Sequence, residues 1–362
     1  MTTAQASSNT LIGKTLPDLE AFVSELGLEK FRAKQIYKWI YTKSLRDFDQ
    51  MTDFSKKTRD LLKEKTQVGS LSLKDKQVSA DGTIKFLFEM DDGNVIESVL
   101  MRFEHNENEY DEDLSEAKKV RHTVCISSQV GCAVGCSFCA TGTLGFKKNL
   151  KAAEIIEQVL FIQAETGERV DNIVYMGQGE PLNNYDEVLS SIEKFREDVG
   201  IGARHITVST SGILPKINQL ADEGIQLTLA LSLHDPEDSD RDYLVPINKK
   251  WNTDDLVSSL KNFVKKTNRR VTIEYVLLRG VNDTEDKAKL LGSLVKDVHC
   301  NINLIPYNPT DVKDPYQRST RASVDKFKEI LEKTSKGKKV TVRKEKGVDI
   351  AAACGQLANK YQ

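Results

Sequence analysis

Residues 131–142 read Gly-Cys-Ala-Val-Gly-Cys-Ser-Phe-Cys-Ala-Thr-Gly and place Cys132, Cys136 and Cys139 in the spacing Cys-x3-Cys-x2-Cys. This spacing brings three thiolates to one compact loop. Four-iron clusters are held by cysteine thiolates, usually four of them, so a loop with three leaves one iron without a protein ligand. A zinc site would need a fourth cysteine or histidine at finger-like spacing, and none stands close to the loop. The loop therefore indicates an iron–sulfur centre with an open position.

The alternatives for these cysteines are a structural disulfide or buried free thiols, and the tight spacing and the flanking glycines disfavour both. An open iron is what S-adenosylmethionine needs in order to chelate through its amino and carboxylate groups. With Phe138 just before the last cysteine, the loop resembles the signature of the radical S-adenosylmethionine (radical SAM) superfamily. This resemblance implies one [4Fe-4S] cluster and S-adenosyl-L-methionine (SAM) as cofactors.

The composition describes a chain of 362 residues, enough for about two domains, with a formal net charge of −2. This charge gives no global signal for polyanion binding, so any nucleic-acid contact is expected to be local. No apolar run could cross a bilayer, and we expect no membrane partner. The polar N-terminus lacks the regions of a secretory signal; the absence of arginine there disfavours a transit peptide but leaves organellar import open. Six cysteines without a signal peptide indicate a reducing compartment, by default the cytoplasm.

Residues 1–66 are predicted to form an N-terminal helical module. Apolar residues recur close to helical spacing in Leu16–Leu26, which stops at Gly27, and in Phe31–Tyr41. Between residues 31 and 65 there are ten lysines or arginines and five acids, with tyrosine and tryptophan interleaved. One interpretation is a solvated module with an aromatic core. The other is that the basic and aromatic residues contact the backbone and bases of RNA.

Residues 67–119 are predicted to form a small β-hairpin extension followed by an acidic insertion. Thr83–Glu89 alternates between apolar and polar residues, Asp91-Asp92-Gly93 is a hairpin turn signal, and Asn94–Met101 returns as a strand. Glu104–Lys118 then holds seven acids and one lysine and offers little that could be buried. We therefore expect a solvated, mobile insertion there.

Residues 120–347 alternate between apolar strands and helices, which predicts an α/β fold with a parallel sheet that is curled or closed. Functional sites on such sheets form at the carboxyl ends of the strands. The resemblance to radical SAM proteins implies a partial (β/α)6 barrel as the core, with residues 348–362 as a C-terminal segment. The predicted strands are His122–Ser127, Asn172–Met176, His205–Ser209, Gln226–Ser232, Arg270–Leu277 and Asn301–Ile305, and the predicted helices include Ala152–Glu165, Pro215–Glu223, Thr253–Lys266 and Thr284–Val298.

Glycines and polar residues at these predicted strand ends are candidates for contact with SAM. Residues 177–181, Gly-Gln-Gly-Glu-Pro, follow a strand but lack the third glycine of a dinucleotide motif. They are either an ordinary turn or a backbone that passes close to a ligand while Glu180 accepts from a cationic amino group, and we favour the second. Ser209 and Asn308 are suitable partners for the ribose and adenine of that ligand. For His234, a structural and a functional role are equally open.

Three cysteines lie outside the cluster loop. Cys300 opens an apolar strand and is predicted to be a buried hydrophobe. Cys125 precedes the first cysteine of the loop by seven residues, at the predicted active rim. Cys354 lies near the C-terminus in the run Ala-Ala-Ala-Cys-Gly-Gln-Leu, where small residues allow close approach to a ligand. A terminal cysteine is usually inert, but a second pair of thiols beside a radical-generating cluster suggests a chemical role.

A series of motifs runs in order along the chain, between about Leu26 and Leu357. They lie at residues 125–132, 179–182, 209–212, 232–234, 245–250, 272–276, 303–309 and 352–357. Through them the chain resembles the RlmN family, radical SAM methyltransferases that modify carbon 2 of a specific adenine at the peptidyl-transferase centre of 23S rRNA and, in some members, of an adenine in tRNA. The related enzyme Cfr methylates carbon 8 of the same rRNA adenine and typically has alanine where this chain has Pro181, so Pro181 favours carbon 2. Gln178 departs from the usual methionine, and the insertion at Glu104–Lys118 is longer than expected.

The resemblance implies a mechanism in which two cysteines and one carboxylate act directly. One SAM methylates Cys354, and a second is cleaved to a 5′-deoxyadenosyl radical, which takes a hydrogen from the methyl group. The resulting carbon radical adds to the adenine, and Glu97 removes the proton from carbon 2. Cys125 then attacks the sulfur of Cys354, which releases the product and leaves a disulfide. The implied cluster ligands are Cys132, Cys136 and Cys139, and the implied SAM-binding residues are Gly179, Glu180, Ser209, Ser232, Leu233, His234 and Asn308.

The same resemblance implies particular partners: 23S rRNA, tRNA as a second substrate in some members, and a low-potential electron donor such as flavodoxin or ferredoxin. It also implies a monomeric cytoplasmic enzyme. Two other functions fit the same motifs. Cfr-like methylation at carbon 8 of adenine would use the same cluster and thiols. A non-catalytic iron–sulfur protein that binds RNA or senses redox state would not need the paired thiols Cys125 and Cys354.

Overall fold

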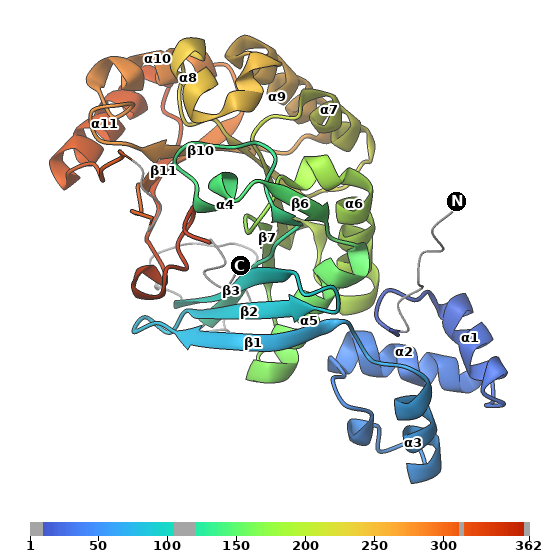
Figure 1. The fold of residues 1–362 in the computed structure, drawn as a ribbon. Helices are drawn as coiled ribbons and strands as arrows, with labels where there is room; N and C mark the ends of the chain where they lie inside the picture. Colours follow the sequence, from blue (N-terminus) through green and yellow to red (C-terminus); the bar gives the residue numbers. More distant parts are fainter. Residues whose placement is uncertain (1–9, 105–119, 311–314, 358–362) are drawn as a thin grey trace, which may run out of the picture.

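The computed structural model describes residues 10–104, 120–310 and 315–357 and contains one large sheet of ten strands (Figure 1). All strand pairs from β4 to β12 are parallel, whereas β1 to β4 pair antiparallel. In the described chain β1 and β12 are the free edges, so the barrel is open. The predicted α/β radical SAM fold is confirmed. In sheet order the strands are β1 (Leu71–Val78), β2 (Ile84–Met90), β3 (Val95–Glu104), β4 (Val120–Cys125), β7 (Asn172–Tyr175), β8 (Ile206–Thr210), β9 (Thr228–Ser232), β10 (Val271–Leu277), β11 (Cys300–Pro306) and β12 (Val340–Val342).

The six strands predicted for the barrel are all present, and the structure adds β12 as a seventh parallel strand. A separate two-stranded ribbon, β5 (Gln129–Gly131) with β6 (Phe146–Asn149), frames the cysteine loop. The short helix α4 (Ala140–Thr143) directly follows the cysteine loop. The longer helices lie outside the barrel strands (Figure 1). They are α5 (Ala152–Thr166), α6 (Tyr185–Lys194), α7 (Leu214–Asp222), α8 (Asp238–Leu244), α9 (Thr253–Thr267), α10 (Glu285–Val295) and α11 (Arg321–Thr334).

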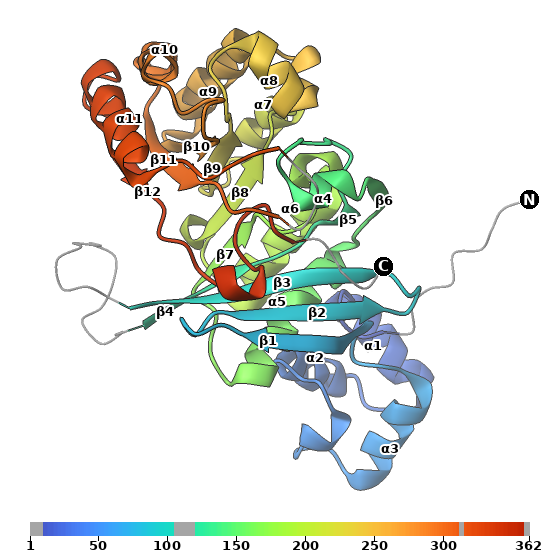
Figure 2. The ribbon, with the colours of Figure 1, turned by 60° about the vertical axis from the view of Figure 1, so that its left-hand side comes forward.

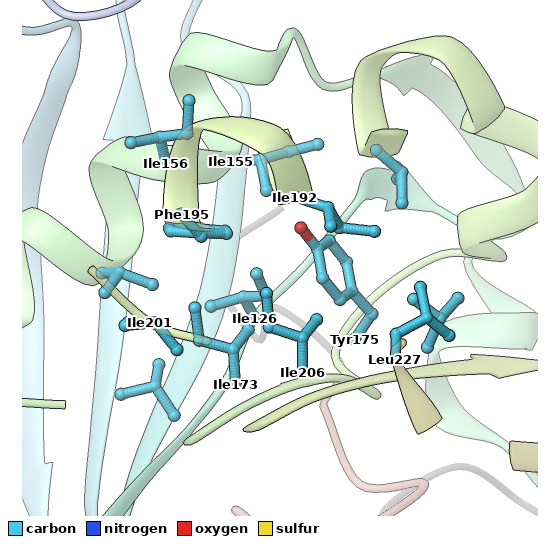
Figure 3. Close-up of a cluster of buried hydrophobic side chains, with 14 of the residues drawn as sticks. Ile126, Ile155, Ile156, Ile173, Tyr175, Ile192, Phe195, Ile201, Ile206 and Leu227 are labelled. Carbon is cyan, nitrogen blue, oxygen red and sulfur yellow. The ribbon is translucent and has the colours of Figure 1, made fainter. Parts of the chain in front are cut away.

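The main core fills the space between the barrel strands and helices α5 and α6 (Figure 3). Ile173 of β7 and Ile206 of β8 are fully buried there, as is Ile155 of α5. The hydroxyl of Tyr175 is hydrogen-bonded to the hydroxyl of Ser191 at 2.6 Å, so this buried ring keeps its polar atom satisfied. This packing holds the parallel strands in register, and their carboxyl ends consequently meet at one rim.

The predicted hairpin is present as β2 and β3, in register from Ile84↔Leu100 to Glu89↔Val95. It continues the barrel sheet, because β3 pairs antiparallel with β4 from Val99↔Cys125 to Glu104↔Val120. Cys125 and the strand that carries Glu97 are therefore neighbours. The acidic insertion predicted at Glu104–Lys118 lies, beyond Glu104, outside the described residues.

The N-terminal residues form three α-helices, α1 (Leu16–Glu25), α2 (Phe31–Lys43) and α3 (Lys56–Lys65), beside β1 and α5 (Figures 1 and 2). Thr15 caps α1 in a capping box with Asp18, and Gly27 just after the helix has φ +69°. Glu157 of α5 joins this module to the barrel, since it binds Arg46 at 2.7 Å. Among the described residues, none of the helices is long and apolar enough to cross a lipid bilayer.

The C-terminal segment runs back over the hairpin and returns to the cysteine loop (Figure 2). The Gly347 amide donates to Asp81 at 3.1 Å, and Asp349 accepts from the Ser79 hydroxyl at 2.5 Å. Farther along, the Ala140 amide donates to the Gly355 carbonyl at 2.8 Å. These contacts fix residues 347–357 at both ends and bring Cys354 to the rim of the barrel.

Candidate active site

The carboxyl ends of the barrel strands surround a cavity of about 170 Å³. Its walls include apolar and aromatic side chains such as Phe138, Val276 and Tyr307. Residues from distant parts of the sequence meet in it, as the position of the strand ends predicts. Nine of the predicted site residues line this cavity, namely Cys132, Cys136, Cys139, Gly179, Glu180, Ser209, Ser232, His234 and Cys354.

The three thiols of the cysteine loop share one buried environment. Burial raises the pKa of Cys132 to about 12, and burial raises the pKa values of Cys136 and Cys139 above the ordinary value of 9.0. For Cys136 the two other thiols raise the pKa further. Three neighbouring thiols of this kind become thiolates only when a strong cation binds them. A metal centre bound here would therefore displace the three thiol protons, whereas without one the thiols stay protonated.

A group of carboxylates is already bound by a cation of the protein itself. Within the described residues, Asp235, Glu237 and Asp240 place candidate ligand atoms within 4.8 Å of one another. The Lys287 ammonium binds all three of those carboxylates at 2.5–2.7 Å. The three thiols of the cysteine loop remain as candidate ligands, and a four-iron cluster offers a separate iron to each thiolate.

The turn after β7 brings its backbone against the cavity. Gly179 has φ +103°, and a Cβ there would lie 2.6 Å from the side chain of Gln129, so only glycine fits. Glu180 is 3% exposed and accepts from the amide and the hydroxyl of Ser211, both at 2.7 Å. Burial raises its pKa, and the Ser211 hydrogen bonds oppose the rise. A cationic group in the cavity would favour the ionised carboxylate.

The ends of β8 and β9 contribute a polar pair and a histidine. The Ser209 and Ser232 hydroxyls lie 3.3 Å apart. His234 has φ +63°, its Nδ1 accepts from the Val276 amide at 3.1 Å, and its ring meets the Phe138 ring edge-on at 5.0 Å. Burial lowers the pKa of His234 to about 3, and Arg241 contributes to the decrease. His234 is thus a neutral ring that supports the residue before Cys139 and presents its other face to the cavity.

Two predicted SAM-binding residues lie outside this cavity. Leu233 is fully buried, and its backbone amide donates a hydrogen bond to the Glu274 carbonyl at 3.0 Å. Asn308 lines a smaller neighbouring cavity and accepts from Arg318 at 3.5 Å. Neither side chain lines the cavity that holds the cluster cysteines in this structure.

Cys125 and Cys354 line that smaller cavity together, so Cys354 lies where the two cavities meet. Burial raises the pKa of Cys125 to about 12, and Cys354 adds to the increase. All six cysteines are free, and the structure contains no disulfide. Cys300 is buried on β11, as predicted, and lines neither cavity. Of the three cysteines outside the cluster loop, Cys125 and Cys354 therefore share a cavity, and their reaction with each other stays a prediction.

Glu97 lies on β3 and is buried, at 4% exposure, outside the cavity of the cluster cysteines. Its Oε1 is 3.4 Å from the Lys85 ammonium, and its Oε2 accepts from the Gln178 side chain at 3.4 Å. Lys85 also donates to the Ala351 carbonyl at 3.3 Å. Lys85 therefore links the Glu97 carboxylate to Ala351 of the C-terminal segment, three residues before Cys354. Gln178 has an identifiable role here, since it holds the carboxylate.

Comparison with known proteins agrees with this arrangement. The radical SAM superfamily matches residues 126–291, and the N-terminal domain of ribosomal RNA large subunit methyltransferases matches residues 9–68. Proteins named "Probable dual-specificity RNA methyltransferase RlmN" from Alkaliphilus oremlandii and Staphylococcus epidermidis are each 44% identical to this chain, over 97% and 95% of its length and 98% and 91% of theirs. A crystal structure of a radical SAM methyltransferase from Sphaerobacter thermophilus has a TM-score of 0.86 at 42% identity, covering 96% of this chain and 98% of that one.

This chain belongs to the RlmN family of radical SAM RNA methyltransferases. The relatives match it along nearly its whole length, so the N-terminal helices, the barrel and the C-terminal segment all belong to the family architecture. Membership implies a four-iron cluster and SAM, and the buried thiols and the polar rim described above fit both groups.

Three residues of this RlmN-family site escaped the sequence analysis. Arg241 of α8 is fully buried and donates to the carbonyls of Leu233 at 2.8 Å and Ser211 at 2.7 Å, so it ties together the loops after β8 and β9. Glu274 and Arg343 line the cavity, and the charges of Cys354, first, and of Glu274 raise the pKa of Arg343. The sequence feature that could have identified Arg241 is its position between the two motifs at residues 232–234 and 245–250.

Proposed function

We propose that this chain methylates carbon 2 of a specific adenine in 23S rRNA through an S-methylcysteine intermediate on Cys354. The observation that carries the proposal is the place of Cys354 between two cavities, one lined by the cluster cysteines and the other by Cys125. A methyl carrier must meet the methyl donor on one side and the resolving thiol on the other. A protein that only binds RNA or senses redox state needs no such arrangement.

Cys132, Cys136 and Cys139 would hold the cluster, and Glu180, with the Ser209 and Ser232 hydroxyls, would bind the amino group and ribose of SAM. When bound, the cluster and SAM together supply a 5′-deoxyadenosyl radical. The buried Glu180 carboxylate contributes a negative charge for the ligand's amino group, and the apolar walls exclude water from the reacting carbon. The protein thus supplies placement and shielding.

The remaining steps belong to the chain's own residues. Cys354 accepts a methyl group from SAM, its methyl carbon forms the bond to adenine carbon 2, and Glu97 accepts the proton from that carbon. The adduct also loses one electron, which a bound cluster would take up. Cys125 then attacks the sulfur of Cys354: a sulfur–sulfur bond forms, the carbon–sulfur bond breaks, its electron pair stays with the methylene carbon, and a proton taken up there completes the methyl group. Both thiols are free in the structure, which is the state required before the reaction.

The rest of the proposal concerns partners. The exposed lysines of α2, such as Lys34 and Lys38, lie one helical turn apart and suit contact with RNA phosphates. The relatives' name "dual-specificity RNA methyltransferase" supports a second RNA substrate, which we propose to be tRNA. We further propose that the chain acts as a cytoplasmic monomer and receives electrons from a flavodoxin or ferredoxin.

Mass spectrometry of digested RNA tests the reaction. Cells that lack the gene are supplied with the parent chain, with Cys354→Ala, or with Cys300→Ala as a matched control of a buried cysteine outside both cavities. The parent and the control should restore 2-methyladenosine in 23S rRNA, and Cys354→Ala should not. Appearance of 8-methyladenosine instead would assign the Cfr-like reaction, and no methylation by the parent would reject both.

A further inference from the structure

A second hollow opens at the opposite end of the barrel, at the amino ends of β4, β7, β8 and β10. Its walls include Asn172, at the start of β7, and Thr207, near the start of β8. The active-site cavity lies at the carboxyl ends of the same strands, and Arg343 lines both, so the hollow reaches from the amino ends of the strands toward the active site. The proposed catalytic steps use no residue at this end.

Arginine dominates the lining of this hollow. Among the described residues, its lining contains six of the chain's 15 arginines and none of the 37 lysines, although lysine is the commoner cation in the sequence. The acid among these lining residues is Asp171, whose carboxylate accepts from the His122 amide at 2.9 Å. Arginine therefore supplies most of the charge of the described lining. Its arginines are Arg121, Arg169, Arg204, Arg269, Arg270 and Arg343.

The arginines are arranged to reach an external ligand. Arg169, Arg204 and Arg270 are exposed, and they come from three different loops that meet at the rim of the hollow. Within the described residues the Arg204 guanidinium makes no hydrogen bond or ion pair, and Arg169 donates only to the Gly200 carbonyl, at 3.3 Å. The structure thus leaves guanidinium donors open toward solvent on more than one side.

Arginine without lysine points to phosphate as the ligand chemistry. A guanidinium is planar and donates two parallel hydrogen bonds to one phosphate, whereas an ammonium acts as a point charge. A surface that serves only solubility would draw on lysine as well. Phosphates that extend from one contact to the next occur in a nucleic-acid backbone, and arginine is frequent at phosphate contacts in such complexes.

We propose that the exposed Arg169, Arg204 and Arg270 at the rim of this hollow bind backbone phosphates of the substrate RNA at a distance from the nucleotide in the active site. The inference rests on the proposed function, since it takes the substrate to be RNA. The N-terminal helices and this hollow would then hold two separate parts of one RNA. Such an arrangement selects large, folded RNAs, because a short hairpin cannot reach both.

The test compares Arg204→Gln/Arg270→Gln with Arg321→Gln/Lys333→Gln, a matched loss of two exposed charges on α11, in the cluster-loaded enzyme. The probe is a 23S rRNA fragment that contains the target adenine and its flanking helices. Binding of the first variant should weaken and depend less steeply on salt, with the slope of log K against log salt reduced by about 0.7 to 0.9 per contact removed. The α11 variant should match the parent. At low salt and saturating RNA, methylation by both variants should keep the parent's kcat.

The outcomes separate the hollow from the reaction. Methylation by the parent together with an unchanged salt slope for Arg204→Gln/Arg270→Gln would overturn the hollow's role and leave the proposed function intact. An unchanged RNA affinity combined with slower methylation, when reduced flavodoxin is the electron donor, would also overturn the hollow's role in RNA binding. That result would assign the hollow to a protein partner. Absence of methylation by the parent would reject the proposed function, whereas the affinity measurement would still report on the hollow.

Discussion

Burial sets the chemistry of Cys125. It raises the pKa of this thiol to about 12, Cys354 raises it further, and the Arg343 guanidinium opposes the increase. Cys125 is therefore a protonated, unreactive thiol until a proton acceptor or a change in its surroundings lets it ionise, because the thiolate is the nucleophile. In the proposed mechanism, Cys125 must therefore lose its proton at the step in which it attacks Cys354.

The alanine variants of Cys354 and Cys125 should have different defects. Cys354→Ala has no methyl acceptor and should give neither methylated protein nor methylated RNA. Cys125→Ala can still form the adduct but cannot break the carbon–sulfur bond, so it should accumulate protein joined covalently to RNA. Glu97→Ala should resemble Cys125→Ala, because the adduct must lose its proton before release. A denaturing gel with and without nuclease detects the linked species.

Cys300→Ala controls for the loss of a buried cysteine and should behave like the parent. Normal turnover by Cys125→Ala, or methylated RNA from Cys354→Ala, would contradict the roles assigned to these thiols.

The cysteines of the site could be predicted from the sequence, but the arginines Arg241 and Arg343 around them could not. The spacing of Cys132, Cys136 and Cys139 is local, and a local pattern can be read from a sequence. Arg241 binds carbonyls that belong to two different loops, and Arg343 follows a three-residue strand. Their partners become neighbours only when the sheet forms, so no pattern along the chain announces them.

Among the elements, the barrel strands and their helices were predicted to within a few residues. β7 and β10 are buried apolar runs bounded by turns, and that pattern is specific. β12 escaped because three residues are too few to show an alternation. The pairing of β3 with β4 escaped because a long acidic insertion separates two strands that are adjacent in the sheet.

The turn between β1 and β2 holds the C-terminal segment, and we expect it to control the reactivity of Cys354. Burial raises the pKa of Asp81, but hydrogen bonds from Thr83 and Gly347 outweigh it and lower the pKa to about 2, below the ordinary 3.8. A depressed pKa means that the ionised carboxylate stabilises the docked segment above about pH 4 and that this contribution is lost as the pH falls toward 2.

Asp81→Ala should therefore increase hydrogen exchange in residues 347–357 and speed alkylation of Cys354 at neutral pH, and the parent should approach the variant's exchange as the pH falls below 4. Asp92→Ala is the matched control: Asp92 accepts from the Asn94 amide at 3.0 Å in the other hairpin turn, on the far side of the hairpin from residues 347–357. Equal exchange in both variants would remove the turn from the docking of the segment.

At the scale of the molecule, one buried carboxylate joins the N-terminal helices to the barrel. Glu157 on α5 is 1% exposed and accepts from Arg46 at 2.7 Å, from the Ser70 amide at 2.7 Å and from the Leu71 amide at 3.0 Å. Arg46 also donates to the Leu71 carbonyl at 2.8 Å and lies over the Phe161 ring at 4.1 Å. These contacts connect the chain just after α2, the start of β1 and a barrel helix.

Glu157→Ala should destabilise the chain by roughly 3 to 5 kcal/mol, because it leaves a largely buried guanidinium and two amides without their acceptor. Glu165 on the same helix pairs with Lys76 at 2.8 Å at the surface, where both side chains are about a third exposed, so Glu165→Gln should cost less than about 1 kcal/mol. Urea unfolding of both variants measures the difference.

If the link also sets the position of the N-terminal helices, Glu157→Ala should raise the KM for RNA at a temperature where the chain is still folded, and iron content should stay at the parent's level. Equal stability of the two variants would show that the helices are held by apolar packing alone.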